Sequence, residues 1–380
     1  MQVDAIETAA AETTGLDDFG DPTYRDGLSV LVDSLDAEAR LSELGVVALE
    51  AQMTTFLKNR LRVIDWRRHH PEVATEPITA PLVVVGLPRT GTTLLSGLLA
   101  CDPARRALRR WEATASVPPP EAATFDSDPR VEEARVAGGM LDTLNPGFKA
   151  IHHEPPEGPT ECVTLLGQHF TSLLWETVAN VPSYGEWLLG VDQRAAYAYH
   201  HDALQLLQSR APGRWSLKSP HHGLALDALW STYPDARVVV THRDPVPVIA
   251  SLCSLVRSLS GTFSDADHTA YIAAHWVDIA DVIVTRMAAA RARRPAAAAL
   301  DVSYADLVRD PVGVLRTIYA WEGSDFAPAI ETRVRAHLDD NAQGKHGRHV
   351  YSLEEFGLRA GEIRERFATY IEDAGLTRAD

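Results

Sequence analysis

Residues 81–93 read PLVVVGLPRTGTT and join an apolar run to a glycine-containing turn. Residues 82–85 are four consecutive apolar residues without alternation, which is typical of a strand buried on both faces of a parallel sheet. A turn with two glycines follows, and the next stretch, TTLLSGLLA, has the composition of a helix. We therefore expect a buried strand, a tight loop and a helix, in that order.

The loop has the glycine spacing of the phosphate-binding P-loop, G-x-x-x-x-G-K-[ST]. In a P-loop, backbone N–H groups and the helix start hold phosphate, and the lysine reaches the outer phosphates. Gly86 and Gly91 are both present here, but Thr92 stands where that lysine belongs. Arg89 lies three residues before Thr92, and a guanidinium there can bind an oxyanion through two hydrogen bonds. The loop predicts a phosphate cradle for a ligand that does not need the lysine.

Two further stretches predict parallel strands. Residues 237–242 read RVVVTH, and RDPVPVIASLCSLVRSL follows them with prolines that suit a helix start. Residues 299–303 form a third candidate strand. Because strands alternate with helices, we expect an α/β fold, a P-loop NTPase-like parallel sheet flanked by helices.

The rest of the chain divides around that sheet. We expect residues 1–80 to form an N-terminal helical extension, with weak order up to about residue 24, and residues 81–380 to form the main domain. Within it, the stretch from about 111 to 208 mixes proline-rich loops with helical segments. We expect this largely helical insert to cover the sheet and shape a substrate cavity.

Composition excludes several classes of protein. The chain of 380 residues carries 36 basic and 52 acidic residues, a net charge of −16, which opposes nonspecific attraction to nucleic acid or anionic membranes. Three cysteines, far apart, predict neither a disulfide framework nor a zinc site. The acidic start lacks the pattern of a secretory signal, and no stretch is apolar enough to cross a membrane. We expect a cytoplasmic protein.

Four blocks of the sequence resemble a known family. The block PRTGTT resembles the 5′-phosphosulfate loop of sulfotransferases that use 3′-phosphoadenosine 5′-phosphosulfate (PAPS), in its bacterial and tyrosylprotein sulfotransferase-like form with arginine. LKSPHH resembles the family's lysine loop, and RVVVTHRDPVPVIASL its 3′-phosphate block. DVSYADLVRDP resembles its Y-E-D-L element, although Ala305 replaces the usual acidic residue. The resemblance covers about residues 82–311 and implies transfer of the sulfuryl group of PAPS to a hydroxyl, in line and without a metal.

The resemblance assigns roles to matching positions. Arg89 and Lys218 are the cations expected to stabilise charge on the 5′-phosphate as the sulfuryl group leaves, and adenosine 3′,5′-bisphosphate is the product. Lys345 and Arg348, in GKHGRHVY, match the family's basic C-terminal loop only loosely. The residues expected to bind the cofactor are Pro88, Arg89, Thr90, Gly91, Thr92, Thr93, Arg243, Ser251, Tyr304, Lys345 and Arg348.

The general base that activates the acceptor stays open at this point. Family members use histidine or glutamate, and Glu112 falls close to the glutamate of the tyrosylprotein relatives. His153 lies in the proline-rich segment, and His222 follows Lys218 closely enough to reach the same acceptor. For each of these residues alone, a structural role is the more common one. Further candidates of the same kind are Glu154, Glu161 and His221.

The sequence gives only weak information about the chemical class of the acceptor. Phe170, Trp175, Tyr184 and Trp187 could line an apolar pocket, although such residues at near-helical spacing more often form a core. No basic track accompanies them, which favours a small-molecule or lipid alcohol over an anionic glycan. We expect no nucleic acid and no stable membrane insertion, and a homo-oligomer stays open.

Two alternatives remain. A kinase that uses ATP would need the lysine that Thr92 replaces, together with Mg²⁺ ligands. A catalytically inactive nucleotide-binding protein would have no reason to keep both Arg89 and Lys218.

Overall fold

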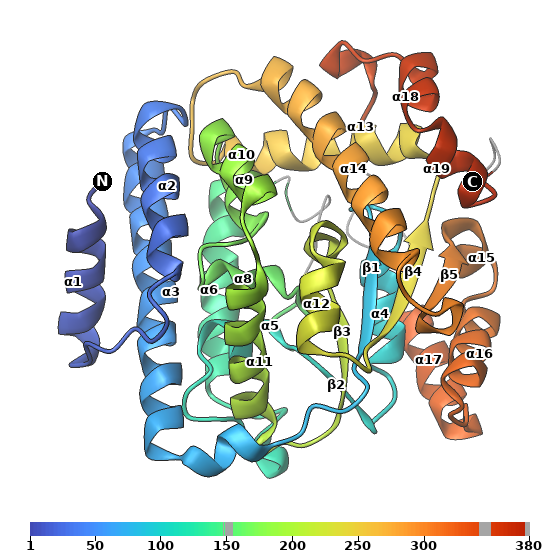
Figure 1. Ribbon diagram of the computed structural model, residues 1–380, viewed down its shortest axis with the longest axis horizontal. Helices are drawn as coiled ribbons and strands as arrows, with labels where there is room; N and C mark the ends of the chain where they lie inside the picture. Colours follow the sequence, from blue (N-terminus) through green and yellow to red (C-terminus); the bar gives the residue numbers. More distant parts are fainter. Residues whose placement is uncertain (147, 149–154, 342–350, 377–380) are drawn as a thin grey trace.

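The computed structural model describes residues 1–146, 148, 155–341 and 351–376. At its centre is a five-stranded sheet in the order β2-β3-β1-β4-β5, and all four neighbouring pairs are parallel (Figure 1). The strands are β1 (Leu82–Gly86), β2 (Arg105–Ala107), β3 (Arg214–Lys218), β4 (Arg237–His242) and β5 (Ala299–Ser303). The predicted parallel α/β fold is confirmed, and β2 and β3 are strands that the sequence did not single out.

Both faces of the sheet are covered. Along β1, Val83 and Val85 belong to the main hydrophobic core, whereas Leu82 and Val84 belong to a second, smaller one. All four side chains are fully buried. The strand is therefore an unbroken apolar run because alternate side chains enter different cores.

Helices on either side supply those two cores. The smaller core is closed by helices that lie along one face of the sheet: α4 (Thr92–Leu99), α15 (Tyr304–Arg309), α16 (Pro311–Glu322) and α17 (Pro328–Asp340). The main core includes residues of α11 (Arg194–Gln208), α12 (Leu226–Thr232), α13 (Pro245–Ser260) and α14 (Thr269–Arg291). The remaining helices of the region are α5 (Arg110–Thr114), α6 (Arg130–Leu144), α8 (Val163–Gly167), α9 (Leu174–Val178), α10 (Pro182–Gly190), α18 (Ala360–Arg366) and α19 (Ala368–Asp373). Short 3₁₀ turns are η1 (Pro71–Thr75), η2 (Ala122–Thr124), η3 (Pro220–Leu224), η4 (Ala296–Ala298) and η5 (Glu354–Phe356).

Three helices precede the sheet: α1 (Val3–Thr14), α2 (Tyr24–Ala37) and α3 (Glu43–His69). The prediction of weak order up to about residue 24 is wrong, because α1 packs against α3 through buried Ile6 and Ala10. Arg60 of α3 fastens the segment after α1, since its guanidinium donates to the carbonyl oxygens of Phe19 at 2.7 Å and Asp21 at 2.9 Å. These tertiary contacts hold a stretch whose own sequence is acidic and rich in alanine.

Candidate active site

The loop after β1 requires glycine at two places. A Cβ on Gly86 would lie 2.4 Å from the Thr241 hydroxyl oxygen, so β1 and β4 can approach closely only without that atom. Gly91 has φ of +91°, in the left-handed region, and a Cβ there would lie 2.9 Å from the ring of Tyr304. Tyr304 therefore packs directly on the loop. Helix α4 begins at Thr92, the residue after Gly91.

Thr90 stabilises the loop from inside. Its hydroxyl lies 2.7 Å from the carbonyl oxygen of Leu87, to which it donates, and 2.6 Å from the hydroxyl of Thr241 on β4. The side chain is fully buried. A contact from Thr90 to a phosphate would therefore come from its backbone N–H.

Arg89 and Arg243 come together at the ends of β1 and β4. Arg243 donates from Nη1 to the carbonyl oxygen of Arg89 at 3.0 Å, and its guanidinium lies 4.1 Å from the ring centre of Tyr304. Arg89 has φ of +72°, and its Nε donates to the Ser251 hydroxyl at 2.9 Å. Burial lowers the pKa of Arg89 below its ordinary value, although an arginine stays protonated. Four of the residues assigned to the cofactor thus form one contiguous group.

Within the described part of the chain, no carboxylate forms an ion pair with Arg89 or Arg243, and the buried Nε of Arg243 has no hydrogen-bond partner. Most buried polar atoms in proteins are paired. Two neighbouring guanidiniums and a free buried donor are the features of a site for an anion.

Lys218 lies at the end of β3, beside β1, where it is the register partner of Val84. Its side chain is completely buried, and Nζ donates to Oε1 of Glu161 at 2.8 Å. The N–H of Cys162 donates to the carbonyl oxygen of Lys218 at 3.0 Å, which fixes Glu161 next to the strand end. The partnership between Lys218 and Glu161 spans 57 residues and had no signal in the sequence.

Glu112 is committed elsewhere. Its two oxygens accept from Nη1 and Nη2 of Arg106 at 2.9 and 2.7 Å, and Oε1 also accepts from the N–H of Arg109 at 2.9 Å. The carboxylate is completely buried. These contacts argue against Glu112 as the general base, because the charge of Arg106 and the start of α5 occupy both oxygens.

The two histidines after Lys218 are also interior. His221 accepts from the N–H of Leu173 at Nδ1 and pairs with Gln193 through Nε2 at 2.8 Å, so both of its nitrogens are used. Burial lowers the pKa of His221 to about 3 and holds the pKa of His222 well below its ordinary value. Both residues are fully buried, which argues against a direct contact with an acceptor.

Several candidates fall outside the described residues. These are His153 and Glu154 among the bases, and Lys345 and Arg348 among the cofactor contacts. Residues of the C-terminal helices do contact the site. The hydroxyl of Tyr370, on α19, accepts a hydrogen bond from the N–H of Arg243 at 3.3 Å. Arg364 forms an ion pair with Asp244 at 2.9 Å. The C-terminal helices therefore support the strand end that carries Arg243, a role that sequence patterns did not reveal.

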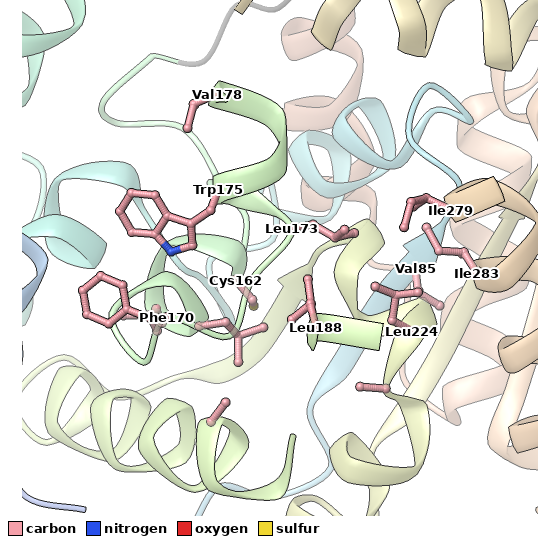
Figure 2. Packing of buried hydrophobic residues seen from close by; sticks show 14 of the residues in the cluster. Val85, Cys162, Phe170, Leu173, Trp175, Val178, Leu188, Leu224, Ile279 and Ile283 are labelled. Atoms are coloured by element: carbon pink, nitrogen blue, oxygen red, sulfur yellow. The ribbon is translucent and has the colours of Figure 1, made fainter. Parts of the chain in front are cut away.

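The aromatic residues of the insert belong to the core. Phe170 and Trp175 stack with ring centres 5.5 Å apart, and Figure 2 shows them packed among other buried residues. The Tyr184 hydroxyl donates to the carbonyl oxygen of Phe170 at 2.8 Å, so its polar end is used internally. These three side chains are buried, and the more common structural role applies to them.

The described residues lack a metal-binding cluster and a membrane-spanning helix. They contain no group of three or more histidine, cysteine, aspartate or glutamate side chains placed to hold a metal ion. In the same part of the chain, no helix combines the length and apolar character needed to span a membrane.

Comparisons with known proteins identify the family to which this chain belongs. A model described as the sulfotransferase family matches residues 81–328. The crystal structure of sulfotransferase STF1 from Mycobacterium tuberculosis H37Rv is similar with a TM-score of 0.87 and 35% identity, covering 97% of this chain and 99% of that one. The crystal structure of sulfotransferase STF9 from Mycobacterium avium gives a TM-score of 0.89 and 32% identity, covering 99% and 97%. A curated relative from Mycobacterium bovis, "Omega-hydroxy-beta-dihydromenaquinone-9 sulfotransferase Stf3", is 24% identical over 325 residues, 80% of this chain and 79% of the relative. The resemblance read from the sequence is confirmed, and the chain belongs to the sulfotransferase family.

Proposed function

We propose that this sulfotransferase takes the sulfuryl group from PAPS and transfers it to the hydroxyl of a lipid or small-molecule alcohol. The observation that carries the proposal is the pair of guanidiniums, Arg89 and Arg243, at the ends of two adjacent strands without a carboxylate partner among the described residues. PAPS has two separate anionic ends, and a kinase substrate such as ATP has one.

The residues present fit such a donor. The spaces that a Cβ would fill at Gly86 and Gly91 allow the backbone to form a narrow turn before α4, whose N-terminus favours a phosphate. Arg243 and Ser251 are suited to the 3′-phosphate, and the free buried Nε of Arg243 is a donor without another use in the described chain. Tyr304 lies against both the loop and Arg243, so its ring would flank a nucleotide bound there. Lys345 and Arg348 remain proposals for the same anion.

Arg89 and Lys218 then carry the electrostatic part of catalysis. PAPS supplies a sulfuryl group joined to a phosphate that leaves as adenosine 3′,5′-bisphosphate. A cation aimed at the bridging oxygen stabilises the charge that develops there, and removal of one such group in other enzymes costs about 100- to 1,000-fold in kcat. Lys218 is buried, so its charge acts in a low-dielectric environment where it is less screened by water.

The acceptor is proposed from a relative. The curated relative's name states that it acts on omega-hydroxy-beta-dihydromenaquinone-9, a lipid-like alcohol. This supports a hydrophobic alcohol for the present chain and agrees with the preference drawn from the lack of a basic track in the insert.

Ligand binding tests the donor. Adenosine 3′,5′-bisphosphate at one hundred times its dissociation constant should raise the unfolding free energy by about 2.7 kcal/mol, measured as a thermal shift. ATP with Mg²⁺ is the competing ligand, and a shift with ATP alone would favour the kinase.

Transfer is tested with a cell extract as the source of acceptors. The protein is incubated with extract and PAPS, and mass spectrometry is used to find a new sulfate ester, which would also identify the alcohol. Arg89→Met should lower its formation at least about 100-fold. The control is Arg335→Gln, because Arg335 is an exposed arginine of α17 that forms an ion pair with Glu331 on the surface. Equal ester formation by the Arg89→Met variant and the wild type would contradict the proposed role of Arg89.

A further inference from the structure

The proposed reaction needs a proton acceptor, and the contacts around the candidates that lie within the described residues favour one of them. Glu112 has both oxygens bound to Arg106, and His221 and His222 are fully buried. Glu161 differs from all three. Its side chain is 22% exposed, and Oε2 has no hydrogen-bond partner among the residues that the structure describes, whereas Oε1 is held by Lys218.

We propose that Glu161 is the general base that removes the acceptor's proton, with Lys218 holding its carboxylate in place; this rests on the proposed function. Glutamate has this task in the tyrosylprotein relatives, but at a position that resembles Glu112, and in this chain that residue faces inward. The base would therefore come from a different segment of the fold.

Two backbone hydrogen bonds fix where Glu161 lies. On one side, the N–H of Thr160 donates to the carbonyl oxygen of Leu108, just after β2, at 2.7 Å. On the other side, the N–H of Cys162 donates to the carbonyl oxygen of Lys218, at the end of β3. Glu161 is thus held between the carboxyl ends of two neighbouring strands, at the edge of the sheet where the loop after β1 also lies.

Electrostatics connects Glu161 with the loop arginine. Burial is the main cause that lowers the pKa of Arg89, and the charge of Glu161 acts on it in the opposite direction. Glu161 therefore lies within electrostatic range of Arg89 while it is bonded to Lys218. One carboxylate that is partly open to solvent is thus bonded to Lys218 and acts electrostatically on Arg89, the two cations assigned to the leaving phosphate.

The step balances as follows. The acceptor hydroxyl transfers its proton to Glu161 as its oxygen forms a bond to sulfur. The bond between sulfur and the bridging oxygen of PAPS breaks, and its electron pair stays on the phosphate of adenosine 3′,5′-bisphosphate. Arg89 and Lys218 stabilise that phosphate, and Glu161 later releases the proton to water.

The test compares acceptors of graded acidity in Glu161→Gln. Glutamine can still accept the Lys218 hydrogen bond through its carbonyl oxygen, so the melting temperature and the affinity for adenosine 3′,5′-bisphosphate should stay close to wild type. PAPS consumption is measured with 4-methylphenol, phenol, 4-chlorophenol and 4-nitrophenol, and with water alone. The control is Glu157→Gln, because Glu157 lies four residues earlier, is 41% exposed and pairs with Arg135 on the surface.

We expect Glu161→Gln to lower kcat with 4-methylphenol and with water at least about 100-fold, the usual contribution of a general base. The loss should shrink along the series and be smallest for 4-nitrophenol, because an acceptor that is already ionised needs no base. Glu157→Gln should match the wild type throughout. If the wild type uses none of the phenols, its reaction with water decides the matter.

Two results would overturn this assignment while leaving the proposed function standing. One is wild-type kcat in the Glu161→Gln variant. The other is an equal loss with every acceptor, which would mean that Glu161 only positions Lys218. A wild-type protein that neither binds adenosine 3′,5′-bisphosphate nor consumes PAPS would instead overturn the proposed function, and the role of Glu161 with it.

Discussion

Replacing Glu112 by glutamine should destabilise the fold and leave sulfuryl transfer nearly intact. The carboxylate receives three hydrogen bonds, two from the buried guanidinium of Arg106 and one from the N–H of Arg109. Arg106 also lies 4.4 Å from the ring centre of Trp215, so it cannot turn toward water without losing its packing. Removing one partner of a buried ion pair costs about 3–5 kcal/mol, because the remaining charge stays buried without compensation.

That loss of unfolding free energy can be converted to a change in melting temperature. An unfolding entropy of about 2.1 cal/mol/K per residue gives roughly 0.8 kcal/mol/K for this chain, so the loss should lower Tm by about 4–6 °C. Glu121→Gln is the matched control. Glu121 pairs with Arg210 on the surface, where such an ion pair contributes about 0–1 kcal/mol to stability. The Tm of the Glu121→Gln variant should therefore be lower than that of the wild type by about 1 °C or less.

The assay combines thermal unfolding with PAPS turnover on the same preparations. The structural role of Glu112 predicts a large fall in Tm together with a kcat within about threefold of wild type, far below the 100-fold effect of losing a base. An unchanged Tm with a kcat lowered 100-fold or more would refute the reasoning and restore Glu112 as a catalytic group.

Three further outcomes follow from the same structure. Gly91→Ala should lower the unfolding free energy by about 1–2 kcal/mol in urea denaturation, because φ of Gly91 is +91° and the Tyr304 ring blocks a Cβ there. The same substitution should weaken the binding of adenosine 3′,5′-bisphosphate, and unchanged binding would contradict this. Ser251→Ala should raise the dissociation constant of that ligand roughly 10-fold in calorimetry, the loss of one hydrogen bond to a charged group, and an unaltered constant would show that Ser251 does not face it. Burial lowers the pKa of His200 to about 3, so the folded state binds fewer protons than the unfolded state, and stability falls as pH drops from about 6.5 toward 3. His200→Gln should make that fall shallower by up to about 1.4 kcal/mol per pH unit between pH 6 and 5; the same slope in both proteins would count against it.

Strands with apolar sequences were predictable, and those with buried charges were not. Residues 237–242 form a strand at the predicted position, and five of its six residues are buried, as the apolar run indicated. Residues 299–303 also form a strand where predicted, although only Val302 of this edge strand is buried. Strand β3 carries Lys218, and β2 carries Arg105 and Arg106. Lys218 and Arg105 are neutralised from distant parts of the chain, by Glu161 and Glu322, and Arg106 is neutralised by Glu112, six residues further on. Local hydropathy contains no information about such partners.

The convergence of the cofactor residues could be predicted for a different reason. In a parallel sheet the carboxyl ends of neighbouring strands lie at one edge, so a loop after β1 and residues after β3 and β4 must meet there. The register supports this, since Val84 on β1 pairs with Lys218 on β3 and with Val239 on β4. The base could not be predicted in the same way. Glu112 and Glu161 both follow β2 in the sequence, and only their hydrogen bonds show that Arg106 occupies both oxygens of Glu112 whereas Lys218 holds one oxygen of Glu161.

The contrast between local and overall charge suggests how an acidic protein can bind an anionic nucleotide. The chain has a net charge of −16, which repels an anionic nucleotide at long range. Arg89 and Arg243 offset this only where they lie together, and both are half-buried. Salt screens exposed charges over about 8–10 Å at physiological ionic strength and screens buried ones much less. Added salt therefore weakens the repulsion from the surface more than the attraction inside the site, so nucleotide affinity should depend less steeply on salt than it would for a site built from exposed basic residues.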